Sequence, residues 1–186
     1  MTNYLLSIDP SIKNTGITFW QNKVPILIKS YSFNGKIDFR KYIVEDIDYY
    51  IMIESLYIYN KDIEDYIYQE NNYNLDLIIE RGTFHSKNGI GYETQEHLRG
   101  FIAGQFNKLL TKNMLISPSE WKKYYWIKLD LPYHKELKKI NEWNKNLSLE
   151  IANNLIEENN WNITISNHDE ADSLLIGWYY LNKEKK

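Results

Sequence analysis

The sequence predicts an α/β protein in which a mixed β-sheet is flanked by helices. Three short apolar runs, 3–8, 15–21 and 25–33, are separated only by turn residues, so we expect three successive strands. Two more short apolar runs follow, and segments with helical periodicity lie between and after them. A meander of strands followed by alternating helices and strands favours one mixed sheet with helices packed on its faces.

The later elements are predicted from periodicity and from turn and capping residues. Beyond the meander, the predicted strands are 75–80 and 113–118, and the predicted helices are 38–70, 91–110, 120–125, 134–160 and 169–181. The first of these helices is either continuous or broken near Asn60. Ser117 or Ser119 is expected to cap the short helix that follows the fifth strand. Asn167 or Asp169 is expected near the start of the last helix.

Chain length and cysteine content narrow the possible architectures and sites. The 186 residues are enough for one domain with its own core, and no internal repeat or linker interrupts them, so residues 1–186 are expected to form a single domain. The absence of Cys excludes disulfides and thiolate metal sites. Any metal ion would then be held by carboxylates, His, carbonyls or water, which favours hard cations.

Neither a targeting signal nor a membrane span is recognisable in the sequence. The segment "MTNYLLSIDP" lacks a basic region and a long apolar stretch, and no run approaches the roughly 18 apolar residues of a membrane helix. These observations predict a soluble, cytoplasmic protein with no membrane partner.

Charge is unevenly distributed along a chain whose net charge is −3. This net charge argues weakly against a nucleic-acid partner, because phosphate binding usually leaves a basic footprint. Residues 40–80 contain ten acidic and three basic residues, whereas residues 122–145 contain seven lysines and three acidic residues. The basic segment is either a solvated helix surface or a surface that faces DNA, and charge alone does not decide between them.

Four acidic residues come from three separate predicted elements. Asp9 ends the first strand, Glu80 ends the fourth, and Asp169 and Asp172 lie three residues apart on one face of the last helix. If the first and fourth strands are parallel neighbours, their carboxyl ends meet at one edge of the sheet. The four acids would repel one another unless cations lay between them, and this oxygen-rich chemistry suits Mg²⁺ or Mn²⁺. Two such ions can activate a water and stabilise the leaving oxygen of a phosphodiester.

Each acid taken alone also has a plainer interpretation. Asp9 stands in "DPS", which is good turn chemistry, and Glu80 could pair with Arg81 at the surface. Asp169 could simply complement the dipole at a helix N-terminus. Asp172 is harder to explain in this way, because it directly precedes the apolar run "LLIGWYYL". The joint placement of the four residues is what favours a metal site.

Three segments together resemble a known family. "LLSIDPSIKNTGI", "LDLIIERGTFHSKNGIGYETQEHLRGFIAG" and "HDEADSLLIG" are similar, in order and spacing, to the RuvC Holliday-junction resolvases of the RNase H-like superfamily. The resemblance implies an RNase H-like fold, with a mixed five-stranded sheet flanked by helices. It also implies that Asp9, Glu80, Asp169 and Asp172 are the catalytic, metal-binding acids. They would hold two Mg²⁺ ions, with Mn²⁺ able to substitute, for nicking that leaves a 5′-phosphate and a 3′-hydroxyl.

The resemblance further implies a set of DNA-binding residues. Phe84 matches, across one extra residue, an aromatic side chain that inserts near the junction centre in the family, and Lys87 and Asn88 continue the same loop. Lys122 in "PSEWKK" and Lys135 in "HKELKK" match basic positions. The basic segment would then make salt-sensitive contacts to backbone phosphates. The implied partner is branched DNA, in particular four-way junctions.

A homodimer and a divergent origin are also implied. The helix that contains Arg99–Gly100 usually builds the dimer interface of the family, and a two-fold dimer suits two symmetric cuts. The first motif reads Asp-Pro-Ser where bacterial members usually have Asp-Pro-Gly, and residues 121–161 match at only a few lysines. These departures suggest a phage, viral or mobile-element type, which would act in a host cytoplasm. His168 stays without an assigned role.

Three classes of function follow from these observations. The first is a Mg²⁺-dependent, structure-selective endonuclease that resolves four-way junctions by paired symmetric nicks. The second is a related nuclease that acts on other branched DNA or on RNA–DNA hybrids. The third is a non-catalytic junction-binding protein or a nucleotide-binding member of the wider superfamily. The short chain disfavours a two-lobed ATPase, and four intact acids disfavour an inactive enzyme.

Overall fold

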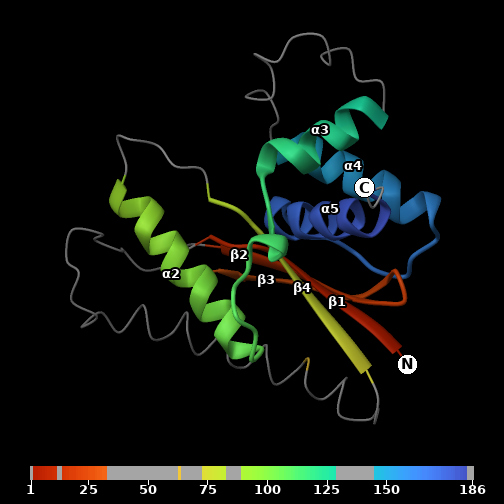
Figure 1. Cartoon of the computed structure of the whole chain (residues 1–186). Coiled ribbons are helices and arrows are strands. Elements are labelled where there is room, and N and C mark those ends of the chain that lie inside the picture. Colours follow the sequence, from red (N-terminus) through yellow and green to blue (C-terminus); the bar gives the residue numbers. More distant parts are fainter. Residues whose placement is uncertain are drawn as a thin grey trace.

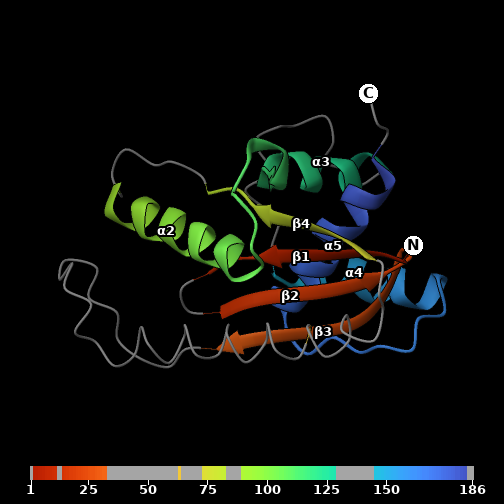
Figure 2. The same ribbon diagram turned by 60° about the horizontal axis from the view of Figure 1, so that its bottom comes forward.

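The described strands form one mixed sheet. The computed structural model describes residues 2–11, 14–32, 73–82, 89–128 and 145–183, together with Ile63. The strands in these ranges are β1 (Thr2–Asp9), β2 (Asn14–Gln21), β3 (Val24–Ser32), β4 (Tyr73–Glu80) and β5 (Leu115–Ile116). Their order is β3-β2-β1-β4-β5, with antiparallel β1–β2 and β2–β3 pairs and parallel β1–β4 and β4–β5 pairs (Figure 2). The prediction of a mixed five-stranded sheet is confirmed.

Helices cover both faces of this sheet (Figure 1). The described helices are α2 (Gly89–Gln105), α3 (Pro118–Lys128), α4 (Lys145–Glu158) and α5 (His168–Asn182). Successive residues of β1 contribute to the cores on opposite faces of the sheet. Leu6 belongs to an apolar cluster with Leu98 of α2, and Leu5 belongs to another with Leu174 of α5. None of the helices in the described ranges is both long and apolar enough to span a membrane.

A two-residue turn joins β2 to β3. Asn22 and Lys23 both have positive φ angles, 49° and 71°. A type I′ hairpin turn requires this conformation at both central positions, and Asn adopts it more readily than most residues. Gln21 and Val24 therefore pair directly across the turn, and an irregularity between Phe19 and Trp20 then shifts the register of the rest of the hairpin.

The helix predicted at 91–110 begins slightly earlier and ends sooner, at Gln105. Asn107 has a φ of 52°, and its N–H donates to the carbonyl oxygen of Gly104 at 3.0 Å. The N–H of Lys108 donates to the carbonyl oxygen of Ala103 at 2.9 Å. This pair of hydrogen bonds is a Schellman motif with Asn at its left-handed position. Periodicity alone did not indicate this stop.

The strand predicted at 113–118 is shorter than expected. Only Leu115–Ile116 pairs with β4, because Lys112–Met114 forms a 3₁₀ turn and α3 begins at Pro118. Ser117 caps α3: its Oγ accepts a hydrogen bond from the N–H of Glu120 at 3.3 Å. The Glu120 carboxylate accepts in return from the N–H of Ser117 at 3.5 Å. This capping box, with Pro at the first helical position, starts a helix longer than the predicted 120–125.

The remaining predicted helices are described in part. Within the segment predicted at 134–160, α4 ends at Glu158, and Asn160, with a φ of 54°, terminates it through a second Schellman motif. Residues 134–144 lie outside the described residues. So does the helix predicted at 38–70, apart from Ile63, which is helical and fully buried.

Buried hydroxyl groups attach α5 to the centre of the sheet. Ser7 Oγ on β1 donates to the carbonyl oxygen of Ser173 at 2.8 Å, and the Ser173 and Thr18 hydroxyls share a hydrogen bond of 2.7 Å. The indole N–H of Trp20 donates to Ser7 Oγ at 2.8 Å. These groups are fully buried and satisfied by one another, so they fix where the first turns of α5 lie above β1 and β2.

Gly16→Ala is expected to destabilise the fold, because Gly16 on β2 lies against the start of α5. A Cβ at this position would overlap the backbone carbonyl oxygen of Asp169. Either the helix or the strand must shift, so we expect the free energy of unfolding to drop by about 1–3 kcal/mol in urea titrations. Gly104→Ala is the matched control: no described atom lies within 4 Å of its Cβ position, and helix propensity favours Ala by about 1 kcal/mol. Equal effects of the two substitutions would contradict this close approach.

Candidate active site

The first two candidate acids lie at the ends of adjacent parallel strands. β1 and β4 run in register from Thr2 opposite Tyr73 to Ile8 opposite Ile79. Asp9 and Glu80 are the next residue of each strand, so both emerge at the same edge of the sheet. The condition under which Asp9 and Glu80 share one edge, that the first and fourth strands are parallel neighbours, is therefore met.

α5 brings the other two acids to the same edge. Its N-terminal cap is Asn167, whose side-chain oxygen accepts hydrogen bonds from the N–H groups of Asp169 and Glu170 at 3.0 and 3.1 Å. The backbone of Asp169 contacts Gly16, which is the partner of Asp9 on β2. The first turn of α5 thus stands beside the end of β1, and Asp172 follows one turn further along the helix.

The pKa values of the four acids show that they share one environment. Burial, followed by the negative charges of Glu80, Asp172 and Asp169, raises the pKa of Asp9 well above its ordinary value. Burial is also the main cause that raises the pKa of Glu80, to about 7, although the positive charge of Lys122 opposes it. The charges and the burial of the cluster therefore oppose its full ionisation.

The two acids of α5 show the same trend. Burial raises the pKa of Asp169, against the opposing charges of His168 and Lys145. Burial likewise raises the pKa of Asp172, against a hydrogen bond from the Ser148 side chain. Both acids are thus partly compensated by α4, where Lys145 and Ser148 lie in the first turn.

The donor chemistry of the cluster fits a hard divalent cation. Oδ1 of Asp172 is buried and has no hydrogen-bond partner in the described part of the chain. A buried carboxylate oxygen without a hydrogen-bond partner destabilises the folded protein unless a cation binds to it. The four side chains offer only carboxylate oxygens, the ligands that Mg²⁺ and Mn²⁺ prefer. As they stand, no three acidic or histidine side chains among the described residues converge closely enough to hold an ion.

Glu80 is held by neighbours on both faces of the sheet. Trp121 of α3 donates its indole N–H to Oε2 of Glu80 at 2.7 Å. Arg99 of α2 donates from Nε to the backbone carbonyl oxygen of Glu80 at 2.7 Å and pairs with Glu96 at 2.9 Å. Arg99 is 2% exposed, which is unusual for a charged residue and is explained by these two partners.

Two lysines flank the acids. The Lys122 ammonium lies 5.0 Å from the centre of the Trp121 ring, and its positive charge lowers the pKa of Asp9 and Glu80 against the dominant effect of burial. Lys145 is exposed, and its positive charge lowers the pKa of Asp169 against the effect of burial. Lys122 was singled out in the sequence, whereas Lys145 was counted only as part of the basic segment.

The described part of the chain contains five of the predicted site residues. The structure brings Asp9, Glu80, Asp169, Asp172 and Lys122 together. The other predicted DNA-binding residues lie outside the described residues: Phe84, Lys87, Asn88 and Lys135.

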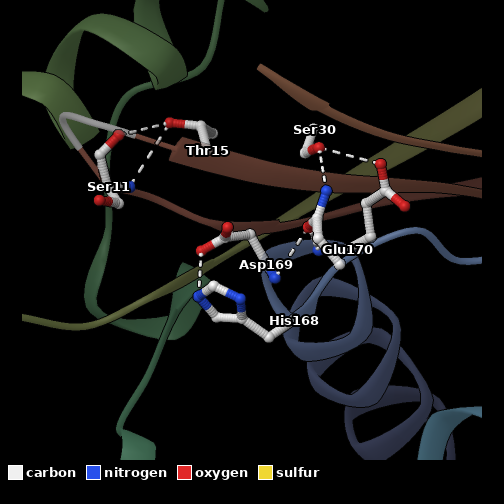
Figure 3. Close-up of polar contacts among 7 residues, drawn as sticks. Ser11, Thr15, Ser30, His168, Asp169 and Glu170 are labelled. Atoms are coloured by element: carbon white, nitrogen blue, oxygen red, sulfur yellow. Dashed lines mark hydrogen bonds and ion pairs between the residues drawn. The ribbon is translucent and has the colours of Figure 1, made fainter. Parts of the chain in front are cut away.

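The residues next to the candidate acids have distinct local roles (Figure 3). His168 Nε2 lies 3.2 Å from Oδ1 of Asp169. Glu170 points away to β3, where its carboxylate accepts from Ser30 Oγ at 2.9 Å, as well as from the N–H of Ser166. Glu170 therefore anchors the start of α5, while Asp169 stays with the other acids.

The turn after Asp9 is held by hydrogen bonds between the Thr15 side chain and the main chain of Ser11. Thr15 Oγ1 donates to the carbonyl oxygen of Ser11 at 2.8 Å, and the N–H of Ser11 donates back to the same hydroxyl at 3.4 Å (Figure 3). These hydrogen bonds connect the end of β1 to the start of β2 just after Asp9. The turn is thereby braced beside the acid cluster.

The sheet order, with antiparallel β3–β2 and β2–β1 pairs and parallel β1–β4 and β4–β5 pairs, is that of an RNase H-like fold. No family model matches the chain, and a search of curated proteins finds no match. Two solved structures resemble it along nearly its whole length. Thermus thermophilus RuvC in complex with a Holliday junction substrate has a TM-score of 0.53 at 10% identity, covering 97% of this chain and 96% of that one. Another Thermus thermophilus RuvC structure has a TM-score of 0.51 at 9% identity, covering 96% and 95%. The chain therefore has a RuvC-like fold.

Proposed function

We propose that this chain is a divalent-metal-dependent endonuclease that resolves four-way DNA junctions by paired symmetric nicks. One observation carries the proposal: four acids from β1, β4 and α5 lie at one sheet edge, where the charges of Glu80, Asp172 and Asp169 add to burial in raising the pKa of Asp9. The RuvC-like fold supports it, and one of the similar structures holds a Holliday junction. We further propose a single nuclease domain over residues 1–186, of a divergent phage, viral or mobile-element type.

In this proposal Asp9, Glu80, Asp169 and Asp172 hold two Mg²⁺ ions, for which Mn²⁺ can substitute. When bound, such ions supply an activated water and charge stabilisation for phosphodiester hydrolysis. The chain's own contribution is to present four carboxylates that give up their protons as the cations arrive. Because the acids do not converge as described, their side chains must draw together on binding.

The flanking lysines would bind the DNA backbone. Lys122 and Lys145 place positive charge near the acid cluster, where phosphates of the cut strand would approach. Such contacts hold the DNA without reading its sequence. Phe84, Lys87, Asn88 and Lys135 are proposed as further DNA contacts. A homodimer would present two such sites to the two symmetric strands of a junction.

The direct test is cleavage of a labelled synthetic four-way junction against a linear duplex of the same sequence, with Mg²⁺ or with EDTA. Paired symmetric nicks on the junction alone, dependent on Mg²⁺, are the expected result. Preferential cutting of a replication-fork branch or an RNA–DNA hybrid would instead indicate a related nuclease that acts on those substrates. Junction binding without any Mg²⁺-dependent cutting would support the non-catalytic alternative.

Lys122→Ala is expected to weaken junction binding equally for all junction sequences. Removing one phosphate contact should lower the slope of log affinity against log salt by about one. Fluorescence anisotropy at several salt concentrations measures this slope. Lys183→Ala is the control, because Lys183 caps the far end of α5 and contacts Tyr179 and Tyr180 instead. An unchanged slope for Lys122→Ala would remove Lys122 from the DNA interface.

A further inference from the structure

Trp121 makes an unusual contact for a buried tryptophan. Its side chain is 0% exposed, yet its single polar group donates to a carboxylate oxygen of Glu80 at 2.7 Å. Burial alone would be served by any large apolar side chain at this position of α3. The indole N–H therefore adds something that packing does not require.

The surroundings of Trp121 fix the direction of this hydrogen bond. The ring lies edge-on to Tyr125, with centroids 6.3 Å apart and an interplanar angle of 80°. Lys122 covers it at 5.0 Å. Upstream, the capping box of Ser117 and Glu120 sets where α3 starts. The indole N–H of Trp121 is thus held in place by the start of α3, and the Glu80 carboxylate is oriented toward it.

The backbone of Glu80 is fixed independently. Arg99 binds its carbonyl oxygen, and the N–H of Arg81, the next residue, donates to the carbonyl oxygen of Ile116 at 2.7 Å. With the main chain restrained in this way, the remaining freedom of Glu80 lies in its side chain. Trp121 removes much of that freedom by holding Oε2.

We propose that Trp121 is a positioning residue, which orients the Glu80 carboxylate for metal binding by holding Oε2 and leaving Oε1 for the cation. This inference rests on the proposed function, because it takes Glu80 as a metal ligand. A neutral donor suits this task, since it orients the carboxylate without cancelling the negative charge that attracts the cation. A lysine or arginine in the same place would compete with the metal ion.

The test compares Mn²⁺ affinities of full-length variants, read from the electron paramagnetic resonance signal of free Mn²⁺. Loss of such an outer hydrogen bond typically costs 10–100-fold in metal affinity, so Trp121→Phe should raise the Mn²⁺ dissociation constant by at least about tenfold. Trp126→Phe is the matched control, because Trp126 lies on the same helix, α3, and is also buried, at 3% exposed. Its Mn²⁺ affinity should stay within about twofold of the wild type.

A second variant guards against misfolding of Trp121→Phe. Replacing Trp121 by benzothienylalanine keeps the bicyclic shape and substitutes sulfur for the N–H, so only the donor is lost. The same weakening is expected. A second readout should separate positioning from damage to the fold: the Mg²⁺ concentration for half-maximal junction cleavage rises, while the rate at saturating Mg²⁺ largely recovers.

The outcomes distinguish this inference from the proposed function. If Glu80→Gln weakens Mn²⁺ binding but neither Trp121 variant does, the positioning role is wrong and the metal centre stands. If Glu80→Gln has no effect on Mn²⁺ binding either, the metal centre itself is misassigned. Weakening by Glu80→Gln and by both Trp121 variants, with Trp126→Phe unchanged, is the result that the structure leads us to expect.

Discussion

Asp9→Asn is expected to lower Mg²⁺-dependent junction cleavage by at least about 10³-fold while leaving junction binding within about twofold. The substitution removes a ligand charge but almost no volume. Cations at such a centre supply several kcal/mol of transition-state stabilisation, and each 1.36 kcal/mol corresponds to about tenfold in rate. Cleavage rates under single-turnover conditions and junction binding in Ca²⁺ or EDTA measure the two quantities separately.

The same variant should be more stable than the wild type when no metal is present. Asp9 is buried among three other acids, which, after burial itself, raise its pKa. A neutral amide at this place relieves that repulsion, so the melting temperature in EDTA should rise, and Mg²⁺ should raise it less than in the wild type. Asp76→Asn, at an exposed position of β4, is the control and should change neither cleavage nor melting. Normal cleavage by Asp9→Asn would refute the assigned role.

The free energy of unfolding of the metal-free protein is expected to fall as the pH rises from about 5 to about 8. Burial is the main cause that raises the pKa of Glu80 from 4.5 to about 7. Between these values the folded state keeps a proton that the unfolded state has already released, so stability is lost as the pH rises through this window. Glu80 alone contributes on the order of 3 kcal/mol. The raised pKa values of Asp9, Asp169 and Asp172 act in the same direction.

Urea unfolding in EDTA at pH 5, 6, 7 and 8 measures this dependence. Millimolar Mg²⁺ should weaken the dependence of the free energy of unfolding on pH, because the cation binds to the acids in place of protons. Glu80→Gln should also flatten part of it, since its amide does not titrate in this range. A metal-free stability that increases steadily over the same range would show that the four acids do not form a buried cluster.

Much of the fold could be predicted because its signals are local. The strand ends at Asp9 and Glu80 follow directly from apolar runs that stop at a carboxylate. The start of α5 follows from Asn167, whose side chain caps two N–H groups as this residue type commonly does. The proximity of Asp9 and Glu80 then depends on a single topological assumption, that β1 and β4 are parallel neighbours, and the pairing confirms it.

The parts that sequence did not predict depend on contacts between distant segments. Arg99 looks like a surface residue of an amphipathic helix until the carbonyl group of Glu80 is placed beside it. Trp121 looks like an apolar core residue, because nothing in its neighbourhood along the chain indicates an acceptor for its N–H. The end of α2 at Gln105 was also not predicted. It is set by the left-handed conformation of Asn107, and the sequence alone does not show which residue near the end of a helix adopts that conformation.

The support of Glu80 from both faces of the sheet has a consequence for how the protein acquires activity. The main-chain contact comes from Arg99 in the α2 layer, and the side-chain contact comes from Trp121 in the layer of α3, α4 and α5. A folding intermediate that has docked only one of these layers would leave either the carbonyl group or the carboxylate of Glu80 unrestrained. Under the proposed function, metal-dependent cleavage is therefore expected only once both layers have docked on the sheet.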